Sequence, residues 1–152
     1  MKKEDKKLFA AASLGGHWKQ LLRITTPLEE RFEVVYASTH PRCASMVGDH
    51  VFYLMADFSR TDVWRFIPSF FRLLRLLRHE HPDAVLTTGA APGLACLLAA
   101  CLLRYKTIWV DSIANAEHLS ASGRIARCFA SRVYTQWPHL ASRDVLYAGS
   151  VF

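Results

Sequence analysis

A chain of 152 residues is the size of one globular domain and leaves little room for a second. Hydrophobic residues make up 51% and charged residues 21%, which is enough for a packed core and excludes wholesale disorder. The net charge of +6 indicates an anionic partner: nucleic acid, anionic lipid or a phosphorylated substrate. None of the four cysteines forms a CxxC pair, so we expect a reducing, cytoplasmic chain with no metal and no cofactor.

Apolar runs alternate with helical patterns along the chain, and neither repeats nor linkers interrupt them. In chain order, we predict a charged tail over 1–7, a strand at Leu8–Ser13, a helix at His17–Thr25, strands at Glu33–Ala37 and Val51–Met55, a helix at Asp62–His79 with a kink at Pro68, a strand at Ala84–Thr88, a helix at Pro92–Leu103, a strand at Thr107–Val110, a helix at Ser122–Ser131, and strands at Val133–Gln136 and Val145–Tyr147. Nearly continuous apolar strands predict an α/β domain over 8–152 with one Rossmann-like, doubly wound parallel sheet. Ligands of such a sheet bind beyond the carboxyl ends of its strands.

Paired glycines follow the first predicted strand. Gly15 and Gly16 let the backbone approach a ligand closely, and the next helix offers free N–H groups and a positive dipole end to a phosphate. His17 stands at the start of that helix, where it could act as a general base or bind phosphate. Trp18 is a further candidate for substrate contact. A Gly-Gly pair alone could be only a tight turn, but its place after the first strand favours a ligand.

A second loop of small residues follows the fourth predicted strand. Thr88, Gly89, Ala90 and Gly93 are its candidate substrate contacts, and Pro92 suits the first turn of the following helix. The loop could be a second phosphate cradle at the mouth of the same sheet. It could equally reflect close packing of helix on strand, which also needs small residues.

The loop after the fifth predicted strand is unusually polar. Asp111 ends the strand, where its carboxylate could orient a sugar hydroxyl or serve in catalysis, and Asn115 and Glu117 follow as candidate substrate contacts. The alternative is a solvated loop with a helix cap at Ser120 or Ser122.

The predicted helix over Asp62–His79 is more apolar than one core face requires, and arginines border its apolar side. This pattern is typical of a helix that lies in a membrane interface, although a core helix with solvated arginines would also fit. The candidate membrane contacts are Trp64, Phe66, Phe70, Phe71, Arg72, Arg75 and Arg78. The longest apolar stretch, Ala90 to Leu103, is too short to span a bilayer, so we predict no transmembrane helix. Nucleic-acid motifs are absent from the sequence, so no nucleic-acid partner is expected.

Several segments, taken in order, resemble one known family. They are Gly15-Gly16-His17-Trp18, the run from Asp83 to Ala90, Asp111-Ser112, the run from Leu119 to Arg124, Thr135-Gln136-Trp137-Pro138, and the run from Tyr147 to Phe152. Together they resemble the membrane-associated, acceptor-binding subunit of two-part GT-B glycosyltransferases. The family includes the eukaryotic subunit that helps add the second GlcNAc to a dolichol-pyrophosphate-linked sugar. It also includes the bacterial PssD type of capsular and exopolysaccharide assembly. More distantly, the chain is similar to the N-terminal half of MurG.

The resemblance implies a Rossmann-like half of a GT-B fold that holds a polyprenyl-pyrophosphate-linked acceptor, while a separate partner chain binds the UDP-sugar donor. His17 or Asp111 would then assist deprotonation of the acceptor hydroxyl, and the two glycine loops would hold the pyrophosphate. Eukaryotic members carry an N-terminal membrane anchor, whereas this sequence starts with a charged tail. That difference favours the bacterial branch and a peripheral, monotopic attachment to an anionic surface at the cytoplasmic face of the membrane.

Two other functions remain open from the sequence. The chain could be a non-catalytic scaffold that recruits a glycosyltransferase to the membrane. It could also be a self-sufficient small α/β enzyme that acts on a phosphorylated metabolite.

Overall fold

The computed structural model describes residues 6–59 and 61–152. Within these ranges, one sheet is built from β1 (Lys7–Ala12), β2 (Glu33–Ser38), β3 (Phe52–Leu54), β4 (Ala84–Thr87), β5 (Lys106–Val110), β6 (Arg132–Thr135) and β7 (Leu146–Tyr147). The helices are α1 (Gly16–Thr25), α2 (Val63–Glu80), α3 (Ala90–Leu102) and α4 (Ala121–Ala126), with short 3-10 helices at Thr26–Leu28, Pro41–Met46 and Pro138–Leu140.

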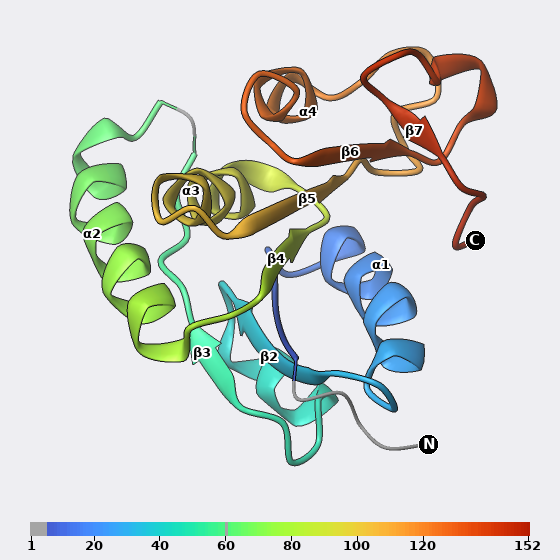
Figure 1. Cartoon of the computed structure of the whole chain (residues 1–152). Coiled ribbons are helices and arrows are strands. Elements are labelled where there is room, and N and C mark those ends of the chain that lie inside the picture. Colours follow the sequence, from blue (N-terminus) through green and yellow to red (C-terminus); the bar gives the residue numbers. More distant parts are fainter. Residues whose placement is uncertain (1–5, 60) are drawn as a thin grey trace.

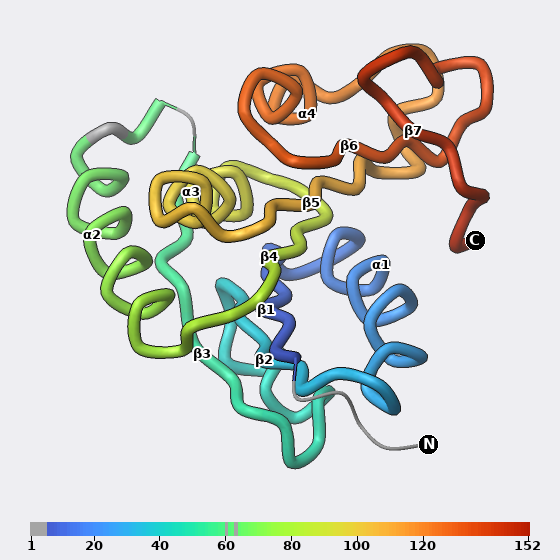
Figure 2. The backbone as a smooth tube through the Cα atoms, in the orientation of Figure 1, coloured from blue at the N-terminus to red at the C-terminus, as the bar shows by residue number. Residues whose placement is uncertain are grey.

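All neighbouring strands run parallel, in the order β3-β2-β1-β4-β5-β6-β7 (Figures 1 and 2). This confirms the predicted doubly wound, Rossmann-like α/β sheet. From β1 the chain adds strands outward through β2 to β3, and it then returns to add β4 on the other side of β1. The order therefore reverses between β1 and β4. In an open parallel sheet, this switch point is where the crevice for a ligand forms.

Helices cover the two faces of the sheet unequally. Side chains alternate along β1, so Phe9 and Ala11 belong to the core under α2 and α3, while Leu8 and Ala10 belong to the core under α1. Figure 1 shows α2 and α3 together on one side and α1 on the other. The α3 helix is apolar all round and packs against α2, β4 and β5, as its composition predicts.

Most predicted boundaries lie within one residue of those in the structure, and the differences at two helices and at the predicted tail have physical reasons. The helix predicted over Ser122–Ser131 ends at Ala126, because the chain tightens there into turns with hydrogen bonds from Phe129 N and Ala130 N to the Ala126 carbonyl. The α3 helix begins at Ala90, before Pro92, since a first-turn proline needs no hydrogen bond of its own. In the predicted tail, residues 1–5 lie outside the described part and Lys7 already belongs to β1.

Charged groups close the amino end of the sheet. Lys7 Nζ lies 3.1 Å from Glu80 Oε2 and 3.5 Å from Glu33 Oε1, and the Tyr53 hydroxyl donates to Glu80. Burial opposes ionisation of Glu80, but the hydrogen bonds from Tyr53 and Lys7 outweigh it and lower the pKa of that carboxyl. The same hydrogen bonds raise the pKa of Lys7, and they raise the pKa of Tyr53 to about 12. Every charge of this cluster has a partner.

Candidate functional site

Two hydrogen bonds join the loops that follow β1 and β4. The Nδ1 atom of His17 lies 3.0 Å from the Thr88 carbonyl oxygen, and the Thr88 hydroxyl donates to the His17 carbonyl oxygen at 2.7 Å. These residues are 71 positions apart in the sequence but lie on opposite sides of the switch point. The two glycine-containing loops therefore form one unit at the carboxyl end of the sheet.

The contact with Thr88 fixes how the His17 ring carries its proton. A carbonyl oxygen can only accept a hydrogen bond, so Nδ1 must be the donor at 3.0 Å. In the neutral ring, Nε2 then keeps the lone pair. A histidine that is oriented in this way, through one nitrogen and a backbone carbonyl, is arranged to accept a proton at the other nitrogen.

Glycine is required at position 89 by both conformation and space. Gly89 has a φ of +143°, and a Cβ atom there would lie 2.5 Å from ring atoms of His17. The next residue, Ala90, also has a positive φ of 64°, which is uncommon outside glycine. Gly16, at the start of α1, is not constrained in this way, because a Cβ atom there would meet no atom within 4 Å. The backbone at residues 89–90 is therefore shaped to fit the His17 ring.

Two helices start at this end of the sheet without a capping side chain. The N-cap residues of α1 and α3 are Gly15 and Gly89, and neither helix has a side-chain cap or an acidic residue in its first turn. Helix starts carry unpaired N–H groups and a partial positive charge. Both helix starts therefore favour an anionic group in the space in front of them.

A polar cleft of about 470 Å³ lies in front of these loops. One wall comes from His17 and from Ala90 and Ala91 at the start of α3. The opposite wall comes from the loop after β5 and the start of α4, with side chains Ser112, Ala114, Asn115, Ser120, Ala121 and Ser122. The structure thus brings together the three loops that the sequence singled out, which follow β1, β4 and β5.

Asp111 occupies a different position from the one that a catalytic base would need. Its carboxylate is 2% exposed and accepts hydrogen bonds from Trp109 Nε1 at 3.0 Å, Ser120 Oγ at 2.6 Å, Ser120 N at 2.9 Å and Asn115 Nδ2 at 3.3 Å. Ser120 in turn caps α4 through Gly123 N. The Asp111 carboxylate therefore accepts four hydrogen bonds from within the protein, and Asp111 anchors the cleft wall.

Two buried glutamines that the sequence reading missed complete this wall. Gln20 of α1 and Gln136 after β6 both donate to the Asp111 carbonyl oxygen at 3.2 Å, and Gln20 also accepts from Ile113 N. Trp137 Nε1 donates to the Ile113 carbonyl oxygen at 2.8 Å. A polar residue on the apolar side of the predicted first helix was the only signal for Gln20. The Gln-Trp-Pro segment thereby gains a structural role in fixing the loop.

Three of the other predicted contacts, Trp18, Gly93 and Glu117, do not line the cleft. Trp18 is 1% exposed and its ring packs edge-on against Tyr36 and Phe52, so it belongs to the core. Gly93 is buried against the Thr87 side chain, which is the close helix–strand packing considered from the sequence. Glu117 is exposed and does not line the cleft.

The structure divides the predicted membrane residues of α2 into two groups. Phe66 and Phe70 turn inward, stack on each other at 5.4 Å between ring centroids and pack against the core. The outward stripe consists of Trp64, Ile67, Phe71, Arg75 and Arg78, at steps of three and four residues, and all five are exposed. We call these five residues the α2 stripe: its first half is apolar and its second half is cationic.

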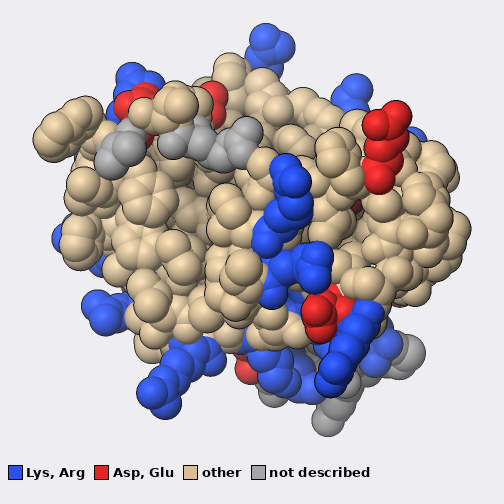
Figure 3. Space-filling view, turned by 90° about the horizontal axis from the view of Figure 1, so that it is seen from above, with Lys and Arg blue, Asp and Glu red and all other residues tan. Residues whose placement is uncertain are grey.

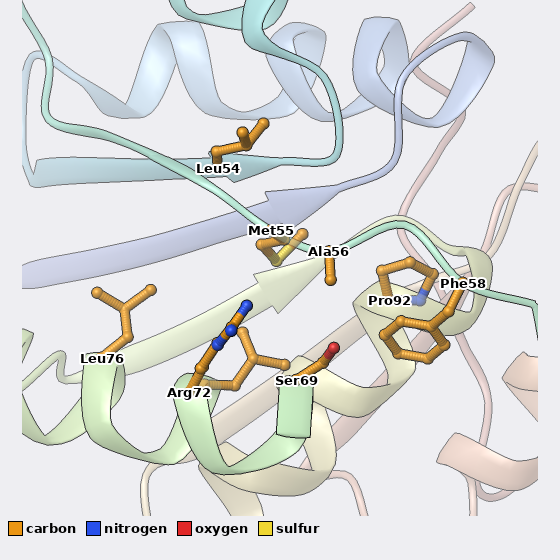
Figure 4. A pocket seen from close by; sticks show the side chains of 9 residues that line it. Leu54, Met55, Ala56, Phe58, Ser69, Arg72, Leu76 and Pro92 are labelled. Carbon is orange, nitrogen blue, oxygen red and sulfur yellow. The ribbon is translucent and has the colours of Figure 1, made fainter. Parts of the chain in front are cut away.

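Arg72 lies off the α2 stripe. Figure 4 shows its side chain pointing from α2 toward the segment of Met55 and Ala56, where it lines a small cavity of about 70 Å³ between α2 and that segment. On the face in Figure 3, Lys and Arg side chains run from the middle of the face to its lower edge, between broad areas that carry neither cations nor acids. On this face, the positive charge therefore lies beside uncharged surface.

Within residues 6–59 and 61–152, no three His, Cys, Asp or Glu side chains come together as a metal site would require. Over the same described ranges, none of the helices has the length and apolarity needed to cross a membrane.

Comparisons with known proteins agree with this geometry. The family model "Oligosaccharide biosynthesis protein Alg14 like" matches residues 53–151. The UDP-N-acetylglucosamine transferase subunit ALG14 of Yarrowia lipolytica is 26% identical, over 93% of this chain and 78% of the relative. MurG of Acinetobacter baumannii superposes with a TM-score of 0.79 at 16% identity, and the match covers 94% of this chain and 45% of MurG. The UDP-N-acetylglucosamine 2-epimerase of Rickettsia bellii gives a TM-score of 0.72 at 13% identity, over 97% of this chain and 46% of the epimerase.

The fold is the Rossmann-like half of a GT-B-type architecture, and the chain spans less than half the length of either solved protein. Because both transferases and epimerases share this fold, the fold alone does not identify the reaction. The family match is more specific than the fold: this chain belongs to the Alg14-like family of oligosaccharide biosynthesis proteins.

Proposed function

We propose that this chain is the acceptor-binding subunit of a two-chain glycosyltransferase, with residues 8–152 as its acceptor-binding domain. The coarse part, a UDP-N-acetylglucosamine transferase subunit in oligosaccharide biosynthesis, is supported by the family and by the relative's name. We further propose that the acceptor sugar is linked to a polyprenyl pyrophosphate and that the subunit attaches to the surface of a membrane. The observation that carries the proposal is the oriented His17 between two uncapped helix starts.

The chemistry follows from that geometry. The pyrophosphate of the acceptor binds in front of α1 and α3, where backbone N–H groups at Gly16 and Ala91 are placed to receive it. The acceptor hydroxyl faces His17 Nε2. As its oxygen attacks the anomeric carbon of the donor sugar, the carbon–oxygen bond to UDP breaks, the hydroxyl proton moves to Nε2, and the configuration inverts. Asp111, Gln20 and Gln136 hold the opposite wall and take no part in the proton transfer.

A partner chain would supply the donor site. One domain of this kind provides only one side of a GT-B cleft, and the sheet face beside α1 leaves room for a neighbour. Along that face a hollow of about 260 Å³ lies over β4, β5 and β6, lined by Leu86, Ile108, Val110 and Tyr134 among others. Of these side chains, Ile108 and Tyr134 are only partly buried and are therefore available to a second protein.

The activity test uses the full chain and its partner. Tagged chain is isolated from the membranes of its native host, the copurifying proteins are identified, and the pair is assayed for transfer from UDP-GlcNAc to a prenyl-pyrophosphate-linked sugar. We expect His17→Ala to lower turnover by about 10²–10⁴-fold, the usual contribution of a general base. His118→Ala is the matched control, because His118 is exposed and does not line the cleft.

Each alternative function gives a different result in this assay. Unchanged turnover of a correctly assembled His17→Ala complex would remove His17 from the mechanism and favour a non-catalytic scaffold. Turnover by the single purified chain without any companion would favour a self-sufficient enzyme. A loss confined to His17→Ala, with partner binding intact, supports the proposal.

The membrane attachment is assigned to the α2 stripe. Its aromatic and aliphatic half suits the headgroup boundary, and Arg75 and Arg78 suit anionic headgroups. The double variant Arg75→Glu/Arg78→Glu is expected to weaken binding to anionic vesicles at least about 30-fold, since each lost cation contributes about 1 kcal/mol and the new carboxylates are repelled. Arg72→Glu changes charge on the same helix but off the stripe and should lose less. Equal binding by the folded double variant and the parent would rule out α2 as the anchor.

A further inference from the structure

An apolar groove of about 430 Å³ lies between α2, α3 and α4. Its walls are the side chains of Phe58, Phe66, Leu94, Leu98, Ile125 and Phe129, and no charged residue lines it among those that the structure describes. The groove is accessible, because Ile125 at its edge is 48% exposed and Leu94, Leu98 and Phe129 are only partly buried. Apolar surface that stays open beside a functional cleft commonly serves to bind a ligand.

The groove continues the polar cleft. Phe58, Ser59 and Ala91 line both of them, so the two hollows meet at the start of α3. From Ala91 the groove follows α3 past Leu94 to Leu98, a distance of about 10 Å along the helix axis. A ligand that fits both hollows must be polar and anionic at one end and apolar at the other.

The lining also indicates what kind of apolar group fits. A peptide segment would bring backbone N–H and C=O groups that need partners, and among the described lining residues only Ser59 has a polar side chain. A hydrocarbon chain makes no such demand. The groove also lies beside the α2 stripe, because Phe66, which lines the groove, is on the same helix between the exposed Trp64 and Ile67. A chain leaving the groove on that side would enter the apolar part of the proposed membrane surface.

We infer that this groove holds the first isoprene units of the lipid-linked acceptor, directly behind its pyrophosphate. The inference rests on the proposed function and extends it from the headgroup to the lipid. The prenyl chain lies against Leu94 and Leu98, and its burial there adds affinity that the pyrophosphate alone does not have. Residues far from the reacting atoms thereby position the acceptor hydroxyl along the cleft.

The test measures binding of three probes to the full chain: farnesyl pyrophosphate, inorganic pyrophosphate and farnesol. The two farnesyl compounds are used below the concentrations at which they form micelles. We expect farnesyl pyrophosphate to bind at least about tenfold more tightly than inorganic pyrophosphate, because several apolar carbons leave water. Leu98→Trp, which fills the groove, should remove that advantage and leave the affinity for inorganic pyrophosphate unchanged. Leu102→Trp is the matched control, because Leu102 lies on the same helix but is 63% exposed outside the groove.

A second variant guards against misfolding of Leu98→Trp. Ile125→Lys places a charge at the exposed lip of the groove, where the fold tolerates it, and should also weaken farnesyl pyrophosphate selectively. Equal affinities of farnesyl and inorganic pyrophosphate would overturn the groove assignment and leave the proposed function standing. Failure of both anionic probes to bind would instead contradict the glycine-loop site and, with it, the proposed function.

Discussion

The two ends of the sheet use their polar groups in opposite ways. At the amino end, the polar groups of Lys7, Glu80 and Tyr53 are paired with one another. At the carboxyl end, two helices start without caps, and His17 keeps one ring nitrogen unused. The comparison teaches that residue type is a poor guide to function. The better guide is whether a polar group still has an unused donor or acceptor that faces open space.

The same contrast divides the carboxyl end itself. Asp111 and His17 are both ionisable residues after buried strands, and the sequence offered either as the base. The Asp111 carboxylate accepts four hydrogen bonds within the protein, whereas the His17 ring is held by one hydrogen bond through a single nitrogen. Substitutions at Gly89 and Asp111 test this division, and a substitution at Tyr53, with a smaller expected effect, tests the pairing at the amino end.

The largest effect is expected for Gly89→Ala. The new Cβ atom would meet the His17 ring at 2.5 Å, on a backbone whose φ of +143° disfavours any side chain. We expect the free energy of unfolding to fall by about 3 kcal/mol, as measured by urea denaturation. Gly16→Ala is the control: it meets no atom within 4 Å and starts a helix, so stability should hold or rise slightly. A Gly89→Ala variant as stable as the parent would contradict the tight fit described here.

A smaller effect is expected for Asp111→Asn. Each carboxylate oxygen accepts two hydrogen bonds, so an amide NH₂ in place of either oxygen would face donors. We expect a loss of about 2 kcal/mol in unfolding free energy, together with faster amide exchange at Ser120. The exposed Glu117→Gln should change stability by less than about 0.5 kcal/mol. If Asp111→Asn kept full stability but lost activity, Asp111 would be a reacting group after all.

The smallest effect is a pH dependence at the amino end. The pKa of Tyr53 is raised to about 12 in the folded chain, so the unfolded chain ionises first as the pH rises. Stability from this group is therefore full below about pH 10 and is lost between about pH 10 and 12. The lowered pKa of Glu80 acts on the acid side, where its contribution is present above about pH 4.5 and is lost below it.

Urea denaturation between pH 8 and 11.5 checks the alkaline part. Tyr53→Phe should show a shallower loss of stability over this range than the parent. Tyr147→Phe, which removes the hydroxyl of an exposed tyrosine, should follow the parent. Identical slopes for Tyr53→Phe and the parent would mean that the Tyr53–Glu80 hydrogen bond contributes nothing to folding.

The sequence predicted the strands and the place of the site, because both depend on local pattern. Apolar runs identify β1, β4 and β5, and the carboxyl-end rule for parallel sheets then locates the cleft. What local pattern could not supply was pairing across long separations. The contacts of Thr88 with His17, and of Gln20 and Gln136 with Asp111, join residues 71, 91 and 25 positions apart. Such contacts depend on how the elements pack, which periodicity does not reveal.

The α2 helix shows the same limit at smaller scale. Its composition predicted a surplus of apolar residues, and the structure bears out that surplus. Which aromatic residues face outward was set by packing partners: Phe66 stacks on Phe70 and meets Phe58 edge-on, so both turn inward, and Trp64 and Phe71 remain outside. A sequence pattern with arginines on several sides of a helix could not separate Arg72 from Arg75.

The frame that holds the loop after β5 has a consequence for how this family can diversify. The loop is held through backbone atoms of Asp111 and Ile113, which are hydrogen-bonded to the side chains of Gln20, Gln136 and Trp137. The side chains that line the cleft are those of Ser112, Ala114 and Asn115. A backbone held in this way keeps its shape when its side chains are exchanged. The loop can therefore accept substitutions that change the chemistry of the cleft wall, while the position of His17 and the rest of the domain stay constant.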